Sequence, residues 1–182
     1  MHNSDNKITA QLVQECCAEV RGLIGDAAEI GVYKGDSAEL ICRELPGSTV
    51  WLFDTFTGMP TDMLEVCDLH FAHAFKDTSV ENVRARLLKY DNARIVCGVF
   101  PETARQLDIR LKFVHVDCDI YLSTLAALWW GWCKLVPGGV MLCDDYLTGS
   151  CPGALKAVEK FMATEDVKCE SKLKRAIFRR QP

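Results

Sequence analysis

Short apolar runs alternate with amphipathic segments along most of the chain. Five of these runs are bounded by glycine, proline or acidic residues, as is typical of buried strands; they lie at residues 27–33, 49–54, 93–98, 111–117 and 140–145. In the segments around them, apolar residues recur at helical spacing. The expected helices cover residues 8–23, 36–45, 78–90, 123–135 and 153–162. Thr78 and Glu81 have the spacing of a capping box at the start of the third helix.

Strands that alternate with helices predict a doubly wound α/β fold with a mainly parallel sheet. Two further runs, at residues 166–171 and 175–180, are expected to close the sheet as an antiparallel pair. The length of 182 residues suits a single domain, residues 1–182, that begins with an N-terminal helix at residues 1–26. Residues from about 55 to 77 form an irregular segment, and connections of that length are usually functional lids or disordered, so we expect a lid-like loop there.

The bulk composition excludes several classes of protein. Hydrophobic residues make up 49% of the chain and charged residues 25%, and the formal net charge is −4, so the chain is ordinary for a globular protein and no nucleic-acid partner is indicated. No apolar stretch approaches the ~20 residues that cross a bilayer, so no membrane partner is expected, and the first residues show no signal-peptide pattern. The ten cysteines include no C-x-x-C pair, which favours reduced thiols in a cytoplasmic protein.

Four carboxylates follow two of the predicted strands. Asp117 and Asp119 come at the end of one apolar run, and Asp144 and Asp145 end another. Ligands of open α/β sheets bind outside the carboxyl ends of the strands, where these acids would repel one another unless a cation or protons neutralised them. A hard divalent cation with oxygen ligands is the natural candidate. The alternative is that two of the four acids cap helices or face water.

A glycine-containing turn follows the first predicted strand. Gly31 and Gly35 would let a nucleotide-like ligand approach the backbone beside a helix N-terminus. Asp54 lies 23 positions after Gly31 at the end of the second strand, where an acid can bind a ribose diol. The spacing Gly-x-x-x-Gly differs from the dinucleotide-binding fingerprint, which counts against hydride transfer. Alternatively, the glycine serves only a tight turn and Asp54 caps a loop.

Several motifs occur in the order seen in one protein family: EIGVYKGDSA, FDTFTGMP, DTSVENVRARL, VDCDIYLST, LVPGG, DDY and CPGALKAVEKF. Over residues 27–163 the chain resembles the macrocin O-methyltransferase family, which comprises metal-dependent class I methyltransferases that use S-adenosylmethionine. The resemblance implies a Rossmann-like class I methyltransferase fold with a mainly parallel seven-stranded sheet and an antiparallel C-terminal strand. It also implies magnesium-dependent methylation of a hydroxyl on a small sugar-like or diol acceptor.

The resemblance further implies roles for individual residues. Asp54 would bind the ribose of the cofactor, Gly98 would lie near its adenine, and Asp119 would be the general base. Asp117, Asp144 and Asp145 match the magnesium ligands of the family. The implied cofactor site comprises Glu29, Gly31, Tyr33, Gly35, Ser37, Asp54, Thr55, Gly98 and Asp117.

Two other functions compete with this interpretation. A metal-dependent hydrolase would keep the cation but use water as nucleophile, although a second set of acids or histidines for a two-metal site is missing. A non-catalytic relative that binds S-adenosylmethionine would be expected to have lost one of the acids, and all four are present.

A few residues have open roles. His70 and His73 in the lid-like loop could face a substrate or the solvent, whereas His115 is expected to be a buried, hydrogen-bonded structural residue. Trp129, Trp130 and Trp132 lie on one predicted helix and mark either a homodimer surface, which we expect, or packing against a neighbouring helix. The basic cluster at residues 172–180 is interpreted as a solvated edge strand.

Overall fold

The computed structural model describes residues 2–181, with side chains described from Asn6 onward. The helices are α1 (His2–Val20), α2 (Asp36–Glu44), α3 (Val80–Leu87), α4 (Tyr121–Lys134) and α5 (Pro152–Glu165). The strands are β1 (Asp26–Ile30), β2 (Val50–Asp54), β3 (Ala93–Cys97), β4 (Leu111–Val116), β5 (Leu135–Cys143), β6 (Glu170–Lys172) and β7 (Arg175–Arg179). Two short 3₁₀ helices cover Thr61–Met63 and Glu102–Ala104.

The strands form one seven-stranded sheet in the order β3-β2-β1-β4-β5-β7-β6. Strands β1 to β5 run parallel to one another, whereas β7 runs antiparallel to β5 and β6 runs antiparallel to β7. The predicted sheet, mainly parallel with antiparallel strands at its C-terminal edge, is confirmed. The strand order reverses between β1 and β4, and ligands of such sheets bind at this switch point.

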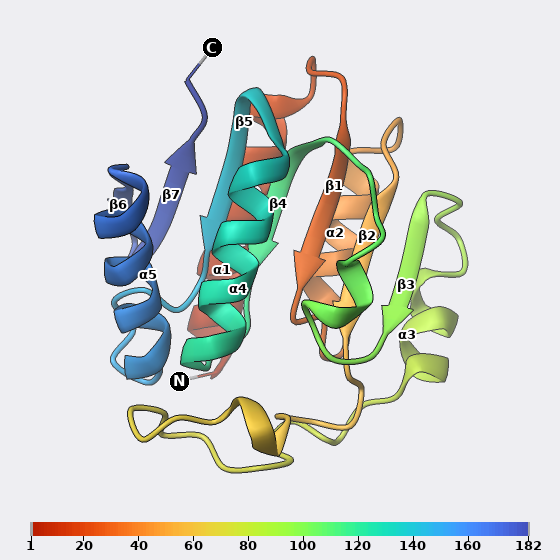
Figure 1. The fold of residues 1–182 in the computed structure, drawn as a ribbon. Coiled ribbons are helices and arrows are strands. Elements are labelled where there is room, and N and C mark those ends of the chain that lie inside the picture. The colour runs from red at the N-terminus through yellow and green to blue at the C-terminus, as the bar shows by residue number, and fades with distance from the viewer. Residues whose placement is uncertain (1, 182) are drawn as a thin grey trace.

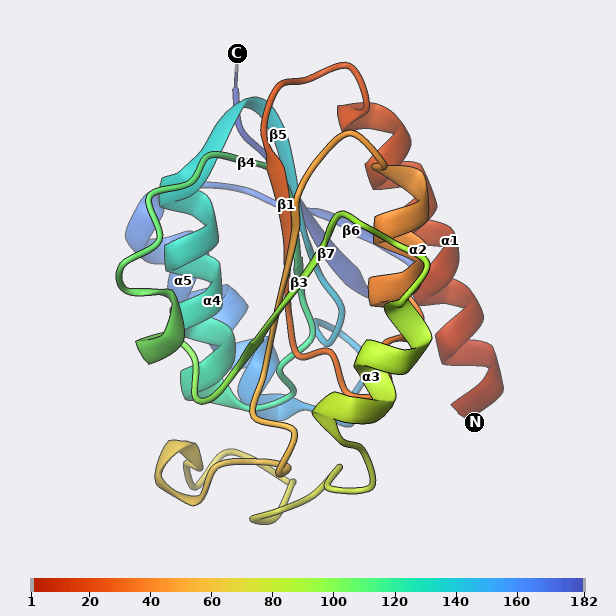
Figure 2. The same ribbon diagram turned by 90° about the vertical axis from the view of Figure 1, so that its right-hand side faces the viewer.

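Helices cover both faces of the sheet. The helices α1, α2 and α3 lie on one face, and α4 and α5 lie on the other (Figure 2). Alternate residues of each central strand therefore enter separate cores: Ala27 and Leu52 pack on the first face, and Ala28 and Phe53 pack on the second. Because both faces are buried, the sequences of these strands are nearly continuous apolar runs.

The tryptophans of α4 pack against the protein interior. Trp132 makes edge-to-face contacts with Phe161 and Phe178, and Trp130 contacts Phe53 in the same way. Trp129 is half-buried. The packing alternative for these residues is therefore correct, and the tryptophan helix no longer argues for a dimer surface. The homodimer stays a prediction.

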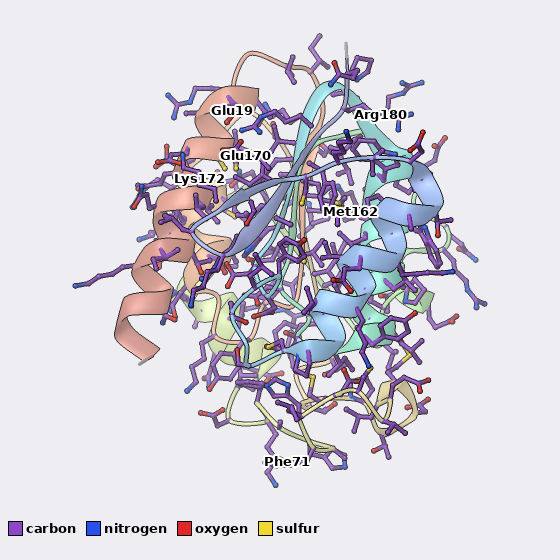
Figure 3. The ribbon with its side chains drawn as sticks, turned by 90° about the vertical axis from the view of Figure 1, so that its left-hand side faces the viewer. Glu19, Phe71, Met162, Glu170, Lys172 and Arg180 are labelled. Carbon is purple, nitrogen blue, oxygen red and sulfur yellow. The ribbon has the colours of Figure 1, made fainter. Side chains whose placement is uncertain are left out.

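Ion pairs fasten the edge of the sheet to α1. Lys172 binds Glu15, and Arg179 binds both Glu19 and Glu170 at 2.7–2.8 Å. Figure 3 shows Glu19, Glu170 and Lys172 together on this side of the molecule. The prediction of a solvated edge strand holds only for Lys172, which lies on the edge strand β6. Strand β7, which carries Arg175 and Arg179, lies between β5 and β6 and is buried over residues 175–178.

Several predicted boundaries are wrong. Helix α3 ends at Leu87 and not at residue 90, α5 extends to Glu165, and β6 covers only Glu170–Lys172. Helix α1 ends at Val20, and β1 already begins at Asp26, so the N-terminal helix is shorter than residues 1–26. Helix α3 is capped by Ser79, whose hydroxyl accepts from the Asn82 N–H, and not by Thr78. The Thr78 hydroxyl donates instead to the Tyr33 carbonyl, a tertiary contact that overrides the local capping-box pattern.

Two other expectations agree with the described residues. None of the helices within residues 2–181 is both long and apolar enough to cross a membrane. All ten cysteines are free thiols, as predicted.

The end of β1 meets the end of β4 at Gly31. The Gly31 N–H donates to Phe53 of β2, and the Asp117 N–H donates to Ile30, so three strand ends are joined at this point. Gly31 has a φ of 90°, and a Cβ atom there would lie 1.7 Å from the carbonyl oxygen of Asp117. Only glycine fits this position.

We predict that Gly31→Ala destabilises the fold by roughly 3–5 kcal/mol, because the clash with the Asp117 carbonyl adds to the strain of a positive φ. Urea unfolding followed by circular dichroism measures this loss. Gly22→Ala is the matched control, since nothing lies within 4 Å of a Cβ at that position. Similar losses for the two variants would contradict the argument.

Candidate functional site

A cavity of about 860 Å³ opens at the carboxyl ends of the parallel strands. In Figure 1 the arrowheads of β1 to β5 point toward the loop at residues 55–77, called the lid from here on, which lies across this end of the sheet. The cavity is also lined by Thr9 of α1 and by Lys174 and Arg175 before and within β7. The site therefore lies where the strand order predicted a ligand crevice.

One wall of the cavity is the turn between β1 and α2. Asp54, at the end of β2, accepts hydrogen bonds from the Val32 and Tyr33 N–H groups at 2.8 Å through one oxygen, and from the Phe56 N–H at 2.7 Å through the other. These bonds fix both the turn and the direction of the carboxylate. Gly35 has a φ of 83° and is the residue before α2, so the N-terminus of that helix faces this wall. Asp54 therefore caps the loop, as the alternative interpretation had it, and it also lines the cavity.

Most residues of the implied cofactor site line this cavity. They are Gly31, Tyr33, Ser37, Asp54, Thr55, Gly98 and Asp117. Glu29 and Gly35 are not part of the lining. Glu29 is fully buried on the other side of β1, where its carboxylate lies 2.8 Å from Nδ1 of His115. This contact confirms His115 as a buried, hydrogen-bonded structural residue.

The lid is fastened at two points. At its far end, the Tyr33 hydroxyl donates to Asp77 at 2.6 Å. In its middle, Asp68 accepts from the Tyr121 N–H at 2.9 Å, at the start of α4, and a Cβ at Gly153 would collide with the same oxygen of Asp68. The lid is consequently docked over the helix N-termini. Sequence reasoning missed this attachment, because a single aspartate in an irregular segment gives no periodic signal.

The two lid histidines have different positions. His70 is half-buried and lines the cavity, whereas His73 is exposed and does not. His70 also packs at 5.5 Å, centroid to centroid, from Phe75. Of the two, His70 is therefore the one that can face a ligand.

Three of the four predicted carboxylates converge on the opposite wall. Oxygen atoms of Asp117, Asp119 and Asp145 lie within 4.8 Å of one another. Asp119 has a φ of 60°, so the extended conformation of β4 does not continue to it, yet its carboxylate still joins the group. Within the part of the chain described, Oδ2 of Asp145 is buried and has no hydrogen-bond partner. We call Asp117, Asp119 and Asp145 the acid cluster.

Asp144, one of the predicted metal ligands, is held outside the acid cluster. Arg175 binds its two oxygens at 3.0 and 3.2 Å, and the Thr9 hydroxyl donates to it at 2.8 Å. The antiparallel register of β5 with β7 places Arg175 beside the end of β5, since Cys143 pairs with Ala176. A buried guanidinium requires a counter-charge, and Asp144 supplies it. Charged residues at the start of an apolar strand were the only sequence signal for this pair.

Burial and mutual repulsion shift the acid cluster toward its protonated forms. Burial, followed by the charges of Asp144 and Asp145, raises the pKa of Asp117 well above its ordinary value. Burial and the charge of Asp145 raise the pKa of Asp119 in the same way. Burial and Asp144 raise the pKa of Asp145 to about 6. A bound cation would remove this repulsion, so the cluster has the electrostatics of a metal site.

The sequence matches a known protein family. A family model described as Macrocin-O-methyltransferase (TylF) matches residues 7–175. The chain belongs to the macrocin O-methyltransferase family. The resemblance inferred from the motifs is thereby confirmed.

Individual relatives agree with this family. Demethyldecarbamoylnovobiocin O-methyltransferase from Streptomyces niveus is 29% identical, with 85% of this chain and 65% of the relative covered. 8-Demethyl-8-(2,3-dimethoxy-alpha-L-rhamnosyl)-tetracenomycin-C 4'-O-methyltransferase from Streptomyces olivaceus is 33% identical, with 74% of this chain and 58% of the relative covered. The chain thus spans less than two thirds of the length of these relatives.

Solved structures share the fold. The O-methyltransferase NovP has a TM-score of 0.80 and 26% identity, covering 95% of this chain and 79% of NovP. The calicheamicin methyltransferase CalS11 has a TM-score of 0.76 at 20% identity, covering 93% of this chain and 77% of CalS11, and it supports the fold alone. The class I methyltransferase fold expected for the macrocin O-methyltransferase family is therefore confirmed.

We predict that Arg175→Met destabilises the protein by about 3–5 kcal/mol, because it leaves the buried Asp144 carboxylate without its cation. Urea denaturation at pH 8 measures the change in the free energy of unfolding. Arg179→Met is a matched control on the same strand, whose half-exposed ion pairs contribute about 0–1 kcal/mol. Equal effects of the two substitutions would show that the Arg175–Asp144 pair has no special role.

Proposed function

We propose that this protein is an O-methyltransferase that uses S-adenosylmethionine and Mg²⁺ to methylate a hydroxyl of a small sugar-like or diol acceptor. The observation that carries the proposal is that two walls of one cavity have complementary chemistry. The glycine turn and Asp54 form one wall, and the acid cluster forms the other. Membership of the macrocin O-methyltransferase family supports the same activity.

The acceptor class follows from the relatives. The relative from Streptomyces olivaceus is named for methylation of a rhamnosyl-bearing tetracenomycin, and another, from Micromonospora griseorubida, is named mycinamicin III 3''-O-methyltransferase. These names support a hydroxyl of a glycosylated natural product as the acceptor.

The turn after β1 is suited to hold the cofactor. Its backbone is fixed by Asp54, and the N-terminus of α2 lies beside it, with Ser37 on the cavity wall. Oδ1 of Asp54 accepts a single backbone hydrogen bond and so keeps a lone pair that can accept from a ribose hydroxyl. Gly98 and Val99, after β3, border the same cavity and are placed to lie along the adenine. When bound, the cofactor supplies an electrophilic methyl group.

The acid cluster fits a magnesium ion. Octahedral oxygen ligands at ~2.0–2.1 Å from Mg²⁺ lie ~2.9–4.2 Å apart, close to the spacing within the cluster. We assign Asp117 and Asp145 as ligands, because the buried Oδ2 of Asp145 otherwise lacks a partner. Asp144 stays a proposed third ligand, because Arg175 holds its carboxylate next to the cluster. The cation would lower the pKa of an acceptor hydroxyl.

Asp119 is placed to accept the hydroxyl proton. It lines the cavity beside Asp117, where its carboxylate can reach a hydroxyl that the cation would acidify. His70 and Phe75 of the docked lid border the same space and help to exclude water. Holding the acceptor between the two walls can contribute ~7–11 kcal/mol to lowering the barrier, because two reactants are oriented in advance.

Methyl transfer tests the function directly. We expect the protein, given S-adenosylmethionine, Mg²⁺ and a panel of glycosylated natural products and simple diols, to add one methyl group, detected by mass spectrometry. EDTA should abolish the transfer, and added Mg²⁺ should restore it, because three converging carboxylates repel one another when they are ionised together without a cation. Full turnover in EDTA would contradict the metal role, and a failure to bind S-adenosylhomocysteine would contradict the function itself.

We predict that Asp119→Asn lowers kcat by about 10²–10⁴-fold, because an amide cannot accept the hydroxyl proton. Calorimetry should show unchanged affinity for S-adenosylhomocysteine. The control is Asp62→Asn, which changes an exposed lid aspartate outside the cavity lining and should leave kcat unaltered. An Asp119→Asn variant with wild-type kcat would remove Asp119 as the base.

A further inference from the structure

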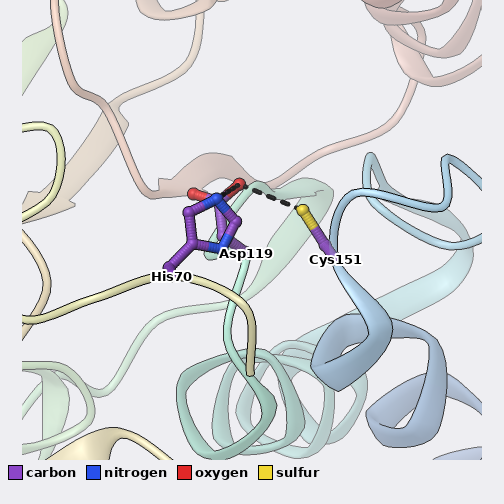
Figure 4. A group of neighbouring side chains, drawn as sticks. All are labelled: His70, Asp119 and Cys151. Carbon is purple, nitrogen blue, oxygen red and sulfur yellow. Dashed lines mark hydrogen bonds and ion pairs between the residues drawn. The ribbon is translucent and has the colours of Figure 1, made fainter. Parts of the chain in front are cut away.

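A second group of metal-binding atoms lies between the lid and the acid cluster. Oδ1 of Asp119 is 3.4 Å from the Cys151 sulfur and 4.0 Å from Nε2 of His70. All three ligand atoms lie within 4.8 Å of one another, and all three residues line the cavity. Figure 4 shows the three side chains side by side. They come from three separate parts of the chain: the lid, the segment after β4 and the residue before α5.

The ligand set is chemically different from that of the acid cluster. Mg²⁺ selects oxygen ligands, whereas one nitrogen, one oxygen and one sulfur suit a borderline-soft cation such as Zn²⁺. Tetrahedral ligands at zinc distances lie ~3.3–3.6 Å apart. The Asp119–Cys151 separation already has this value, and the lid would have to bring the His70 nitrogen closer than its present 4.0 Å from Asp119.

The surroundings favour such an ion. Cys151 is 4% exposed and is the residue immediately before the 14-residue helix α5, whose N-terminus stabilises negative charge on a sulfur. Nδ1 of His70 is buried and has no hydrogen-bond partner among the described residues, so no contact fixes the tautomer of the ring. Either ring nitrogen can therefore be the unprotonated one that binds a metal.

We propose that His70, Asp119 and Cys151 form a binding site for one Zn²⁺-class cation, with the fourth coordination position open to the cavity. Three protein ligands and one open position are the arrangement of exchangeable zinc sites. The proton of the Cys151 thiol is released to solvent when the sulfur binds the cation.

Burial and the charges of Asp145 and Asp119 raise the pKa of the Cys151 thiol, which keeps the sulfur protonated in the absence of metal. A divalent cation reverses this effect, because coordination deprotonates a thiol outright. Without metal, Cys151 is thus an unreactive thiol, and metal binding must release the proton of that thiol.

The proposed site shares Asp119 with the acid cluster and joins the lid to the start of α5. An ion bound there would tie His70 down and occupy the carboxylate of Asp119. If Asp119 is the base of the proposed methyl transfer, a Zn²⁺-class cation inhibits that reaction while Mg²⁺ supports it. This consequence depends on the proposed function, but the binding site itself does not.

Cobalt(II) titration of the full chain tests the binding site without any activity measurement. Co²⁺ bound by oxygen ligands alone in the acid cluster gives weak octahedral bands, whereas Co²⁺ at the proposed site gives intense tetrahedral visible bands and a sulfur-to-cobalt charge-transfer band. We expect the charge-transfer band to saturate at one equivalent of Co²⁺ and to disappear when Zn²⁺ is added. Titration with no such band in the wild-type protein would overturn the proposal.

Two variants and two controls locate the site. Cys151→Ser should abolish the charge-transfer band, and His70→Ala, in the lid, should weaken Co²⁺ binding at least tenfold. Cys133→Ser and His73→Ala change exposed residues outside the cavity lining and should leave the spectrum and the affinity unchanged. If Cys151→Ser fails to fold, the comparison of His70→Ala with His73→Ala still decides. Equal affinity in those two variants, or a charge-transfer band that survives in folded Cys151→Ser, would refute the assignment.

Discussion

Repulsion between carboxylates at the ends of β4 and β5 is the constraint on which the rest of the site depends. Asp144 is compensated by the buried Arg175. The acid cluster instead relies on protonation, reflected in raised pKa values, or on a cation. The docked lid and Cys151 border the same charges, since His70 and Cys151 line the cavity and Cys151 donates to Asp119.

The two walls of the cavity are joined by close contacts at the ends of the parallel strands. Gly31 allows the end of β1 to approach the carbonyl of Asp117 closely, and the same turn is fixed by Asp54. The cavity wall formed by the turn after β1 and the wall formed by the acid cluster are therefore joined by the few residues around Gly31. Their relative position is set by the sheet and does not depend on flexible side chains.

The sequence predicted much of this architecture because the physics involved is local. Apolar runs that end in acids identified the strands and placed Asp54, Asp117 and Asp145 at one edge of the sheet. The N-terminal glycine turn was equally visible, since its residues are close in the chain. Glu29 was assigned to the cofactor by resemblance, yet its carboxylate is fully buried against His115 and does not line the cavity.

What the sequence did not reveal depends on contacts between distant segments. The Arg175–Asp144 pair needs the register of β7 on β5, and the lid attachment needs Asp68 to reach the start of α4. Neither contact leaves a periodic pattern along the chain. The same holds for the group of His70, Asp119 and Cys151, whose members lie on three separate elements.

The most direct test of the central claim is the thermal stability of Asp145→Asn with and without Mg²⁺. If the buried acids repel one another, removing one charge should raise the Tm in EDTA at pH 8, although most substitutions of buried residues lower it. The wild-type protein should gain stability with added Mg²⁺, and the variant should gain much less. A lower Tm for Asp145→Asn in EDTA, together with an unchanged response to Mg²⁺, would contradict the account.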